Sequence, residues 1–311
     1  MIKRMLNLFS SIRRIIGNIE NWTTQTHLAA YQLILTQRKM KTSELELHQY
    51  GFKVYSQWEE DGILSFILDT MKLHKPRILE LGAGNFLESN SRFLCEYFSA
   101  AAYLVDARND LQDGIIESGL MWKTHIKFEN TWVDTLSIKN IWSNALGYLK
   151  YIDILSIDVD GQDYWILKTI DLSEIKVIVC EFNPIFGGQI AVSVPEDSNF
   201  RRNAKTKNLF WGASLQAFNH LLKSQGFCLI GTNLVGNNAF FVQQKYLDKF
   251  NIILPIEEKN SFKIDYLIRE SVDANGGLDF IDFSESQSFI ENQYVFDLET
   301  ESLCKLKDLL A

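Results

Sequence analysis

The stretch LELGAGNFLESN (residues 79–90) places a short apolar strand directly before a glycine-rich turn. Glycine allows a tight turn and lets a ligand approach the backbone, which Gly82 and Gly84 would permit here. Glu80 is an acid inside the apolar strand, where a carboxylate needs specific hydrogen-bond donors. Leu87 stands where the third glycine of the dinucleotide motif GxGxxG would be. The turn therefore indicates a nucleotide-like ligand without the full dinucleotide motif.

Outward from this turn, short apolar runs alternate with helical patterns. Strands are predicted at 77–82, 101–107, 125–133, 152–160, 177–183, 227–233 and 239–244. Helices are predicted at 89–98, 114–122, 136–146, 162–170 and 212–226. This alternation is typical of a doubly wound α/β fold with a mostly parallel sheet, and the last two strands are close enough to pair antiparallel. Ligands of such sheets bind at the carboxyl ends of the strands.

The chain of 311 residues divides into three predicted parts, which are an N-terminal helical segment (1–50), the sheet domain (51–250) and a C-terminal extension packing on it (251–311). The first 22 residues combine lysine and arginine with an apolar helical face. They lack the continuous apolar core of a secretory signal. This segment fits an interfacial membrane helix, a dimer-forming helix, or a helix packing on its own domain.

Composition restricts the class of protein. Hydrophobic residues make up 46% and charged residues 23%, which is typical of a soluble globular protein. The net charge of −8 disfavours a broad nucleic-acid-binding surface. The four cysteines form no CxxC pair, so a zinc site has no support and reduced thiols of a cytoplasmic protein are expected. No apolar run is long enough to span a bilayer.

The second predicted strand ends in Asp106, roughly 20–25 residues after the glycines. A doubly wound fold places an acid there to accept hydrogen bonds from both ribose hydroxyls. The pattern ExGxG followed by this aspartate fits S-adenosylmethionine better than NAD. S-adenosylmethionine has no pyrophosphate, so the third glycine is dispensable.

Several segments in this order resemble the class I S-adenosylmethionine-dependent methyltransferases, and more narrowly the FkbM-type branch found among bacterial polysaccharide and natural-product gene products. They are SQWEEDGIL (56–64), LELGAG (79–84), LSIDVDGQDYW (155–165), CEFNPIFG (180–187), GASLQAF…GTNLVGNNAFFV (212–242) and YLIRES…GGL (266–278). The resemblance covers about residues 50–285. It implies methyl transfer to sugar hydroxyls or related polar groups, and a seven-stranded sheet whose last strand is antiparallel.

The resemblance also implies a set of residues around the cofactor, namely Glu80, Gly82, Gly84, Asp106, Gln57 and Asp61. Glu80, Gly82 and Gly84 would line the methionine and ribose part of the cofactor, and Asp106 would hold the ribose. Gln57 and Asp61 would lie near the opening of the cofactor site. The sequence departs from many relatives at Asn85-Phe86-Leu87, where a shorter side chain or a glycine is usual.

Acidic residues end two further strands. Asp158 and Asp160 are two residues apart on one predicted strand, and Glu181 and Asn183 are two residues apart on the next. The two side chains of each pair therefore project from the same face of their strand. Adjacent parallel strands would bring these groups together, where they repel unless a cation or donors lie between them. One reading is Mg²⁺ or Mn²⁺ held by Asp158, Glu181 and Asn183, lowering the pKa of a bound substrate hydroxyl.

Two other readings of these acids remain open. Without a metal, Asp158, Asp160 and Glu181 would accept hydrogen bonds from substrate hydroxyls, one of them acting as general base. Alternatively they cap helices or pair with Arg201, Arg202 or Lys168. The long polar insertion at 194–214 supplies these arginines, which would otherwise receive a phosphate or carboxylate of the substrate.

These observations predict an O-methyltransferase that acts on a sugar hydroxyl of a bacterial surface polysaccharide, glycan or sugar-nucleotide precursor. The expected partners are a small-molecule or glycan substrate and a second copy of the chain, with peripheral membrane contact through the basic helix at the inner face. Nucleic acid is not expected. The alternatives are N-methylation, an NAD(P)-dependent oxidoreductase on a Rossmann-like fold, and a non-catalytic binding module in envelope assembly.

Overall fold

The structure is a computed structural model that describes residues 44–255 and 271–310, together with single positions between 23 and 34. The chain divides into two compact units, Met1–Glu44 and Leu45–Ala311. The basic helix predicted at the start lies outside the described residues, and so do residues 266–270. Residues 45–50, which we assigned to the helical segment, belong to the second unit.

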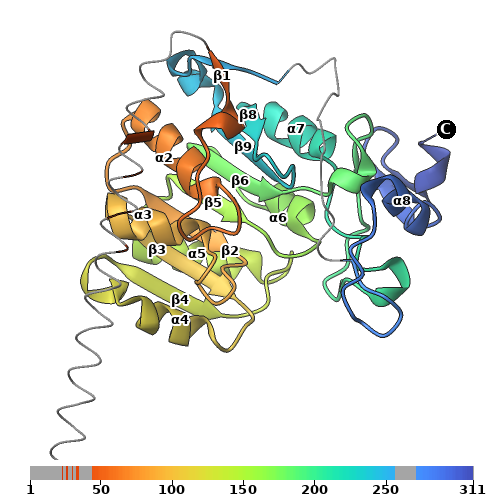
Figure 1. The fold of residues 1–311 in the computed structure, drawn as a ribbon, viewed down its shortest axis with the longest axis horizontal. Helices are drawn as coiled ribbons and strands as arrows, with labels where there is room; N and C mark the ends of the chain where they lie inside the picture. The colour runs from red at the N-terminus through yellow and green to blue at the C-terminus, as the bar shows by residue number, and fades with distance from the viewer. Residues whose placement is uncertain are drawn as a thin grey trace, which may run out of the picture. The chain divides into compact units, whose positions relative to one another are not determined.

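A seven-stranded sheet forms the centre of the second unit (Figure 1). Its order is β4-β3-β2-β5-β6-β9-β8. All neighbours are parallel except β9, which is antiparallel to both β6 and β8. The strands are β2 (Arg77–Leu81), β3 (Ala101–Asp106), β4 (Ile126–Asn130), β5 (Ile154–Ile157), β6 (Val177–Glu181), β8 (Phe227–Thr232) and β9 (Asn238–Gln243). This is a doubly wound, Rossmann-like α/β fold in which the sheet's last strand along the chain is antiparallel to its neighbours, which confirms the predicted fold.

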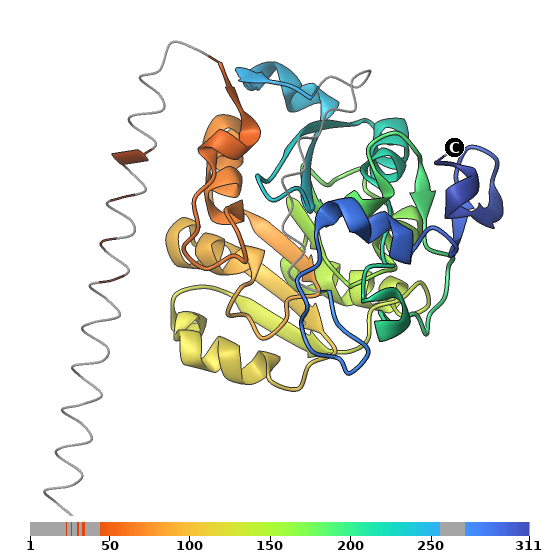
Figure 2. The ribbon, with the colours of Figure 1, turned by 45° about the vertical axis from the view of Figure 1, so that its right-hand side comes forward.

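Helices cover both faces of the sheet (Figure 2). They are α2 (Glu60–Met71), α3 (Asn90–Phe98), α4 (Leu111–Ser118), α5 (Ile138–Leu149), α6 (Asp163–Thr169) and α7 (Leu215–Ser224). The apolar sides of α5, α6 and α7 form one buried cluster with Leu79 and Leu81, which point to the same face of β2. Glu80 lies between them in the strand and points to the opposite face, which α3 contacts.

The register of the sheet aligns apolar side chains across neighbouring strands. Leu79 of β2 is paired with Leu155 of β5, which is paired with Ile178 of β6. All three are fully buried. Burial of such a side chain contributes about 1.5–3 kcal/mol. This apolar layer fixes the level at which the strands end, and therefore which residues emerge at the carboxyl edge.

A second, three-stranded sheet joins the segment just before the insertion (194–214) to the C-terminal extension. Its strands are β7 (Val192–Ser193), β11 (Tyr294–Asp297) and β12 (Ser302–Lys305), and β11 is antiparallel to both others. Both views show α8 (Phe283–Ser286) beside the insertion (Figures 1 and 2). The sequence did not predict this sheet.

The remaining elements are short. β1 (Leu45–Glu46) pairs in parallel with β10 (Ile252–Ile253). The 3-10 turns are η1 (Leu47–Tyr50), η2 (Leu120–Trp122), η3 (Pro184–Phe186), η4 (Ala204–Thr206), η5 (Gln244–Lys249), η6 (Gln287–Phe289) and η7 (Leu306–Asp308). Within the described part of the chain, every helix is too short or too polar to cross a membrane.

Candidate functional site

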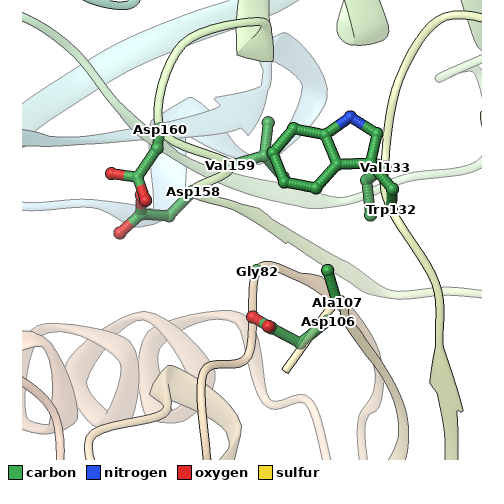
Figure 3. Close-up of a pocket in the computed structure, with 8 residues that line it drawn as sticks. All are labelled: Gly82, Asp106, Ala107, Trp132, Val133, Asp158, Val159 and Asp160. Atoms are coloured by element: carbon green, nitrogen blue, oxygen red, sulfur yellow. The ribbon is translucent and has the colours of Figure 1, made fainter. Parts of the chain in front are cut away.

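A cavity of about 90 Å³ opens at the carboxyl edge of the sheet (Figure 3). The residues that line it follow the ends of β2, β3, β4 and β5, and they are Gly82, Asp106, Ala107, Trp132, Val133, Asp158, Val159 and Asp160. The carboxylates of Asp158 and Asp160 lie side by side at one end of the cavity. Because sites that enclose a drug-sized ligand measure about 300–1,000 Å³, a nucleoside would be only partly enclosed here.

Gly82 brings the ends of β2 and β5 into close contact. Its φ is +85°, and a Cβ at this position would lie 1.6 Å from the carbonyl oxygen of Asp158. Gly84 has a φ of +58° with nothing within 4 Å of a built Cβ, and its N–H donates a 2.7 Å hydrogen bond to Asp106 Oδ2. The glycine turn therefore packs on the acidic strand end on one side and on Asp106 on the other.

Asp106 is held by backbone donors at the cavity wall. Its Oδ2 accepts from the Gly84 N–H at 2.7 Å and its Oδ1 from the Arg108 N–H at 2.8 Å. Burial raises the pKa of this carboxyl, while the two backbone hydrogen bonds oppose the rise. Each oxygen keeps acceptor capacity beyond one bond. The geometry is thus suited to receiving ligand hydroxyls at the predicted position.

Glu80 accepts hydrogen bonds from the start of a helix, and its predicted cofactor contact stays a prediction. Its buried carboxylate accepts from Ser89 Oγ at 2.6 Å and from the N–H groups of Asn90 and Ser91 at 2.9 and 3.1 Å. It therefore satisfies the first turn of α3, and burial raises its pKa. It is not among the residues that line the cavity.

The two residues predicted near the cofactor's mouth also lie outside the cavity lining. Asp61 is buried, and its Oδ2 accepts from the N–H groups of Val54, Tyr55 and Ser56 at 2.7, 2.6 and 3.1 Å. Burial raises its pKa to about 6. Gln57 is exposed. Asp61 thus folds the segment before α2, and the cofactor contact of both residues stays a prediction.

The acidic strand ends meet as predicted. Oxygen atoms of Asp158, Asp160 and Glu181 all lie within 4.8 Å of one another. The guanidinium of Arg202 contacts two of these acids, at 2.6 Å from Asp160 and 3.2 Å from Glu181. Burial, together with the negative charge of Asp160 and Asp163, raises the pKa of Asp158 well above its ordinary value. The pairing with Arg202 that one of the open readings named is therefore present in this structure.

Asn183 does not turn its amide toward these acids. The side chain is fully buried, and its Nδ2 donates to the carbonyl oxygens of Leu209 and Trp211, each at 2.9 Å. Its Oδ1 accepts from the Ile185 N–H at 3.0 Å. The amide therefore caps η3 and ties it to the insertion, which gives no support to the predicted role as a metal ligand.

Asp163 supports the turn that carries the acids. Its carboxylate accepts from the Val159 N–H at 2.9 Å and the Gly161 N–H at 3.1 Å. It lies in the first turn of α6, and burial raises its pKa to about 6. Asp160 has a φ of +60°, an uncommon conformation for a residue other than glycine. The turn therefore holds Asp160 in a specific, strained orientation.

Trp132 is a cavity residue that the sequence analysis missed. Its Nε1 donates to the carbonyl oxygen of Ser198 at 3.2 Å, and the guanidinium of Arg201 lies 3.5 Å from its ring centroid. Both contacts connect the end of β4 with the insertion. The rule that ligands bind at the carboxyl edge could have identified Trp132, because it is the last residue but one of the strand predicted at 125–133.

No protein-family profile matches this chain, and no curated protein matches it by sequence. Solved structures do match, with low TM-scores. The N-terminal domain of EvdMO1, determined in the presence of S-adenosylhomocysteine and D-fucose, has a TM-score of 0.38 and 10% identity over 68% of this chain and 95% of its own. The METTL16 methyltransferase domain has a TM-score of 0.37 and 12% identity, covering 59% of this chain and 66% of its own.

A further match is an S-adenosylmethionine-dependent methyltransferase from Clostridium acetobutylicum, with a TM-score of 0.35 and 11% identity over 58% of this chain and 88% of its own. Similarity at this level does not transfer an activity to this chain. The fold assignment therefore rests on the strand order and strand directions of the sheet.

Proposed function

We propose that this protein is an S-adenosylmethionine-dependent methyltransferase. The observation that carries the proposal is the position of Asp106, a strand-end carboxylate with spare acceptor capacity beside the Gly82 turn. Asp106 would hold the ribose hydroxyls, and Gly82 would let the ligand approach the backbone. The cofactor, when bound, supplies a methyl group already activated on a sulfonium.

We further propose an O-methyltransferase of the FkbM type acting on a sugar hydroxyl of a surface polysaccharide, glycan or sugar-nucleotide precursor. Support comes from the cavity lining, where the carboxylates of Asp158 and Asp160 suit substrate hydroxyls and the indole of Trp132 offers a flat apolar face. Asp158 is suited to act as the general base, because its raised pKa brings it toward the neutral range where a base works best. The remaining work of the site is alignment of the reacting atoms.

Mg²⁺ or Mn²⁺ was one prediction for the acids, and the available donors fit it poorly. Asn183 uses its amide oxygen on the Ile185 N–H, and Arg202 contacts Asp160 and Glu181. A hard divalent ion takes about six oxygen ligands. We therefore propose the metal-free form of the reaction, in which the carboxylates bind the acceptor directly.

The proposal extends to location and assembly. A cytoplasmic protein that forms homo-oligomers and contacts the inner membrane face through residues 1–22 remains our expectation. The test for that segment is vesicle co-sedimentation of the full chain against a chain beginning at Leu45. Equal sedimentation of both chains would remove the membrane proposal.

The enzymatic proposal is tested with S-adenosylmethionine carrying a labelled methyl group and a panel of sugar nucleotides and oligosaccharides. We expect label in an acceptor and an equal amount of S-adenosylhomocysteine. Tight NADH binding without binding of S-adenosylmethionine would favour the oxidoreductase instead. Two results together would favour a binding module. The protein would bind the cofactor without transferring a methyl group to any acceptor, and an Asp158→Ala variant would bind as well as wild type.

A further inference from the structure

We propose that the guanidinium of Arg202 is the resident cation of the acidic cluster and occupies the place that one reading of the sequence gave to a divalent ion. Arg202 is then a positioning residue that holds Asp160, which lines the cavity, together with the buried Glu181. The structural part of this inference stands on geometry alone. Its consequence for catalysis rests on the proposed function.

The first support is the environment of the guanidinium. The Arg202 side chain is 13% exposed, and that of Glu181 is 5% exposed. A carboxylate buried to this extent requires a compensating charge or donors. The guanidinium provides both, with contacts of 2.6 Å to Asp160 and 3.2 Å to Glu181. Its other face lies 4.2 Å from the ring centroid of Trp211, a stacking arrangement that favours arginine over lysine.

The second support is the anchoring of the segment that carries Arg202. Gln162 Nε2 donates to the Pro195 carbonyl oxygen at 3.2 Å, and its Oε1 accepts from the Asp197 N–H at 3.0 Å. The ring of Phe200 packs so closely on Gly161 that a Cβ there would lie 2.4 Å from it. These contacts tie the insertion to the turn that presents Asp160. The guanidinium is therefore placed by the fold.

The third support is competition for the same oxygens. A divalent ion bound by this cluster would need the carboxylates of Asp160 and Glu181, which the guanidinium already contacts. Two cations in this space would repel each other. Metal binding would therefore require Arg202 to leave. Removing its charge while keeping a side chain of similar length should create a divalent-ion site from the remaining carboxylates.

The test is a titration with Mn²⁺ followed by electron paramagnetic resonance, using wild type, Arg202→Met, Arg202→Lys and Arg201→Met. Arg201 is a matched control, since its guanidinium stacks on Trp132 and is not in the acidic cluster. We expect Arg202→Met to bind Mn²⁺ at least about tenfold more tightly than the other three proteins. Adding Glu181→Gln to Arg202→Met should abolish the gain.

Two results would overturn the inference. One is tight Mn²⁺ binding by wild type, with Arg202 in place. The other is no gain in a folded Arg202→Met protein, with folding checked by circular dichroism. If Arg202→Met does not fold, Arg202→Ala takes its place, and tight binding by wild type remains decisive by itself.

An activity measurement connects the inference to the proposed function. Wild-type transfer should be insensitive to EDTA, whereas transfer by Arg202→Met should fall and recover when Mn²⁺ is added. Wild-type transfer that is lost on EDTA treatment and restored by Mn²⁺ would contradict the resident-cation role. Absence of transfer by wild type would count against the methyltransferase proposal, while the Mn²⁺ titration would still decide the role of Arg202.

Discussion

Replacement of Gly82 by alanine should damage both the stability of the fold and the cavity. A Cβ at this position would lie 1.6 Å from the Asp158 carbonyl oxygen, and it needs at least 3.0 Å, so the strand ends must separate by about 1.4 Å. The φ of +85° adds about 1–2 kcal/mol for a left-handed alanine. Forced displacement in a packed region adds about 1–3 kcal/mol. We expect a total loss of roughly 2–5 kcal/mol.

Gly84→Ala is the matched control for this variant. Its φ is also positive, at +58°, but no atom lies within 4 Å of the built Cβ. It should therefore cost only the conformational part, about 1–2 kcal/mol. The assay is urea unfolding of both variants and wild type, together with titration of S-adenosylhomocysteine. Equal losses of unfolding free energy in the two variants would refute the close approach of Gly82 to Asp158.

Three further changes have defined outcomes. Asp106→Ala should weaken binding of S-adenosylhomocysteine about 100-fold in calorimetry, because two charged hydrogen bonds contribute about 1.5 kcal/mol or more each. Glu80→Gln should lower the free energy of unfolding by about 1–3 kcal/mol, because α3 loses an acceptor, and leave that affinity unchanged. Asp61 has a folded-state pKa of about 6 against 3.8 ordinarily, so its contribution to stability should fall as pH rises from about 4 to about 6. Asp61→Asn should remove that fall, measured as unfolding free energy at both ends of the range.

Each of these predictions has its own control. Asp110→Ala removes an exposed acid that pairs with Arg108 on the same loop, and it should leave cofactor affinity within about twofold. If it weakens binding as much as Asp106→Ala does, the ribose role of Asp106 is wrong. A large loss of affinity in Glu80→Gln would support the predicted contact of Glu80 with the cofactor. An unchanged pH dependence in Asp61→Asn would show that other groups dominate that range.

The main sheet could be predicted because each of its strands is a compact apolar run with a clear end. The run before Gly82 and the run ending in Asp106 are both fully formed strands, and their paired register brings these two residues to one edge. Local pattern and the carboxyl-edge rule were therefore sufficient for the fold and for the position of the site. The acids Asp158, Asp160 and Glu181 meet for the same reason.

The three-stranded sheet could not be predicted in this way. β7 is two residues long, which is too short to show a period, and its partner β11 lies far away in the sequence. Pairing over such a distance is decided by tertiary packing. The sequence pattern assigned 251–311 only to an irregular extension.

The sequence pattern also could not predict the contacts of individual polar residues. Spacing predicted that Glu80 and Asn183 lie near the site, but not which donors they meet. Glu80 accepts a hydrogen bond from the start of α3 on the far face of its strand, and Asn183 donates hydrogen bonds to the backbone of the insertion. Arg202 was one of several proposed partners for the acids, and only the folded insertion selects it.

The central claim is that the cleft between Asp106 and Asp158 binds a sulfonium nucleoside. A crystal structure of the protein grown with saturating S-adenosylhomocysteine tests this claim most directly. We predict density for the ribose hydroxyls at the carboxylate of Asp106 and for the sulfur on the side of Asp158. An empty cleft at saturation, or the nucleoside bound elsewhere on the protein, would contradict the account.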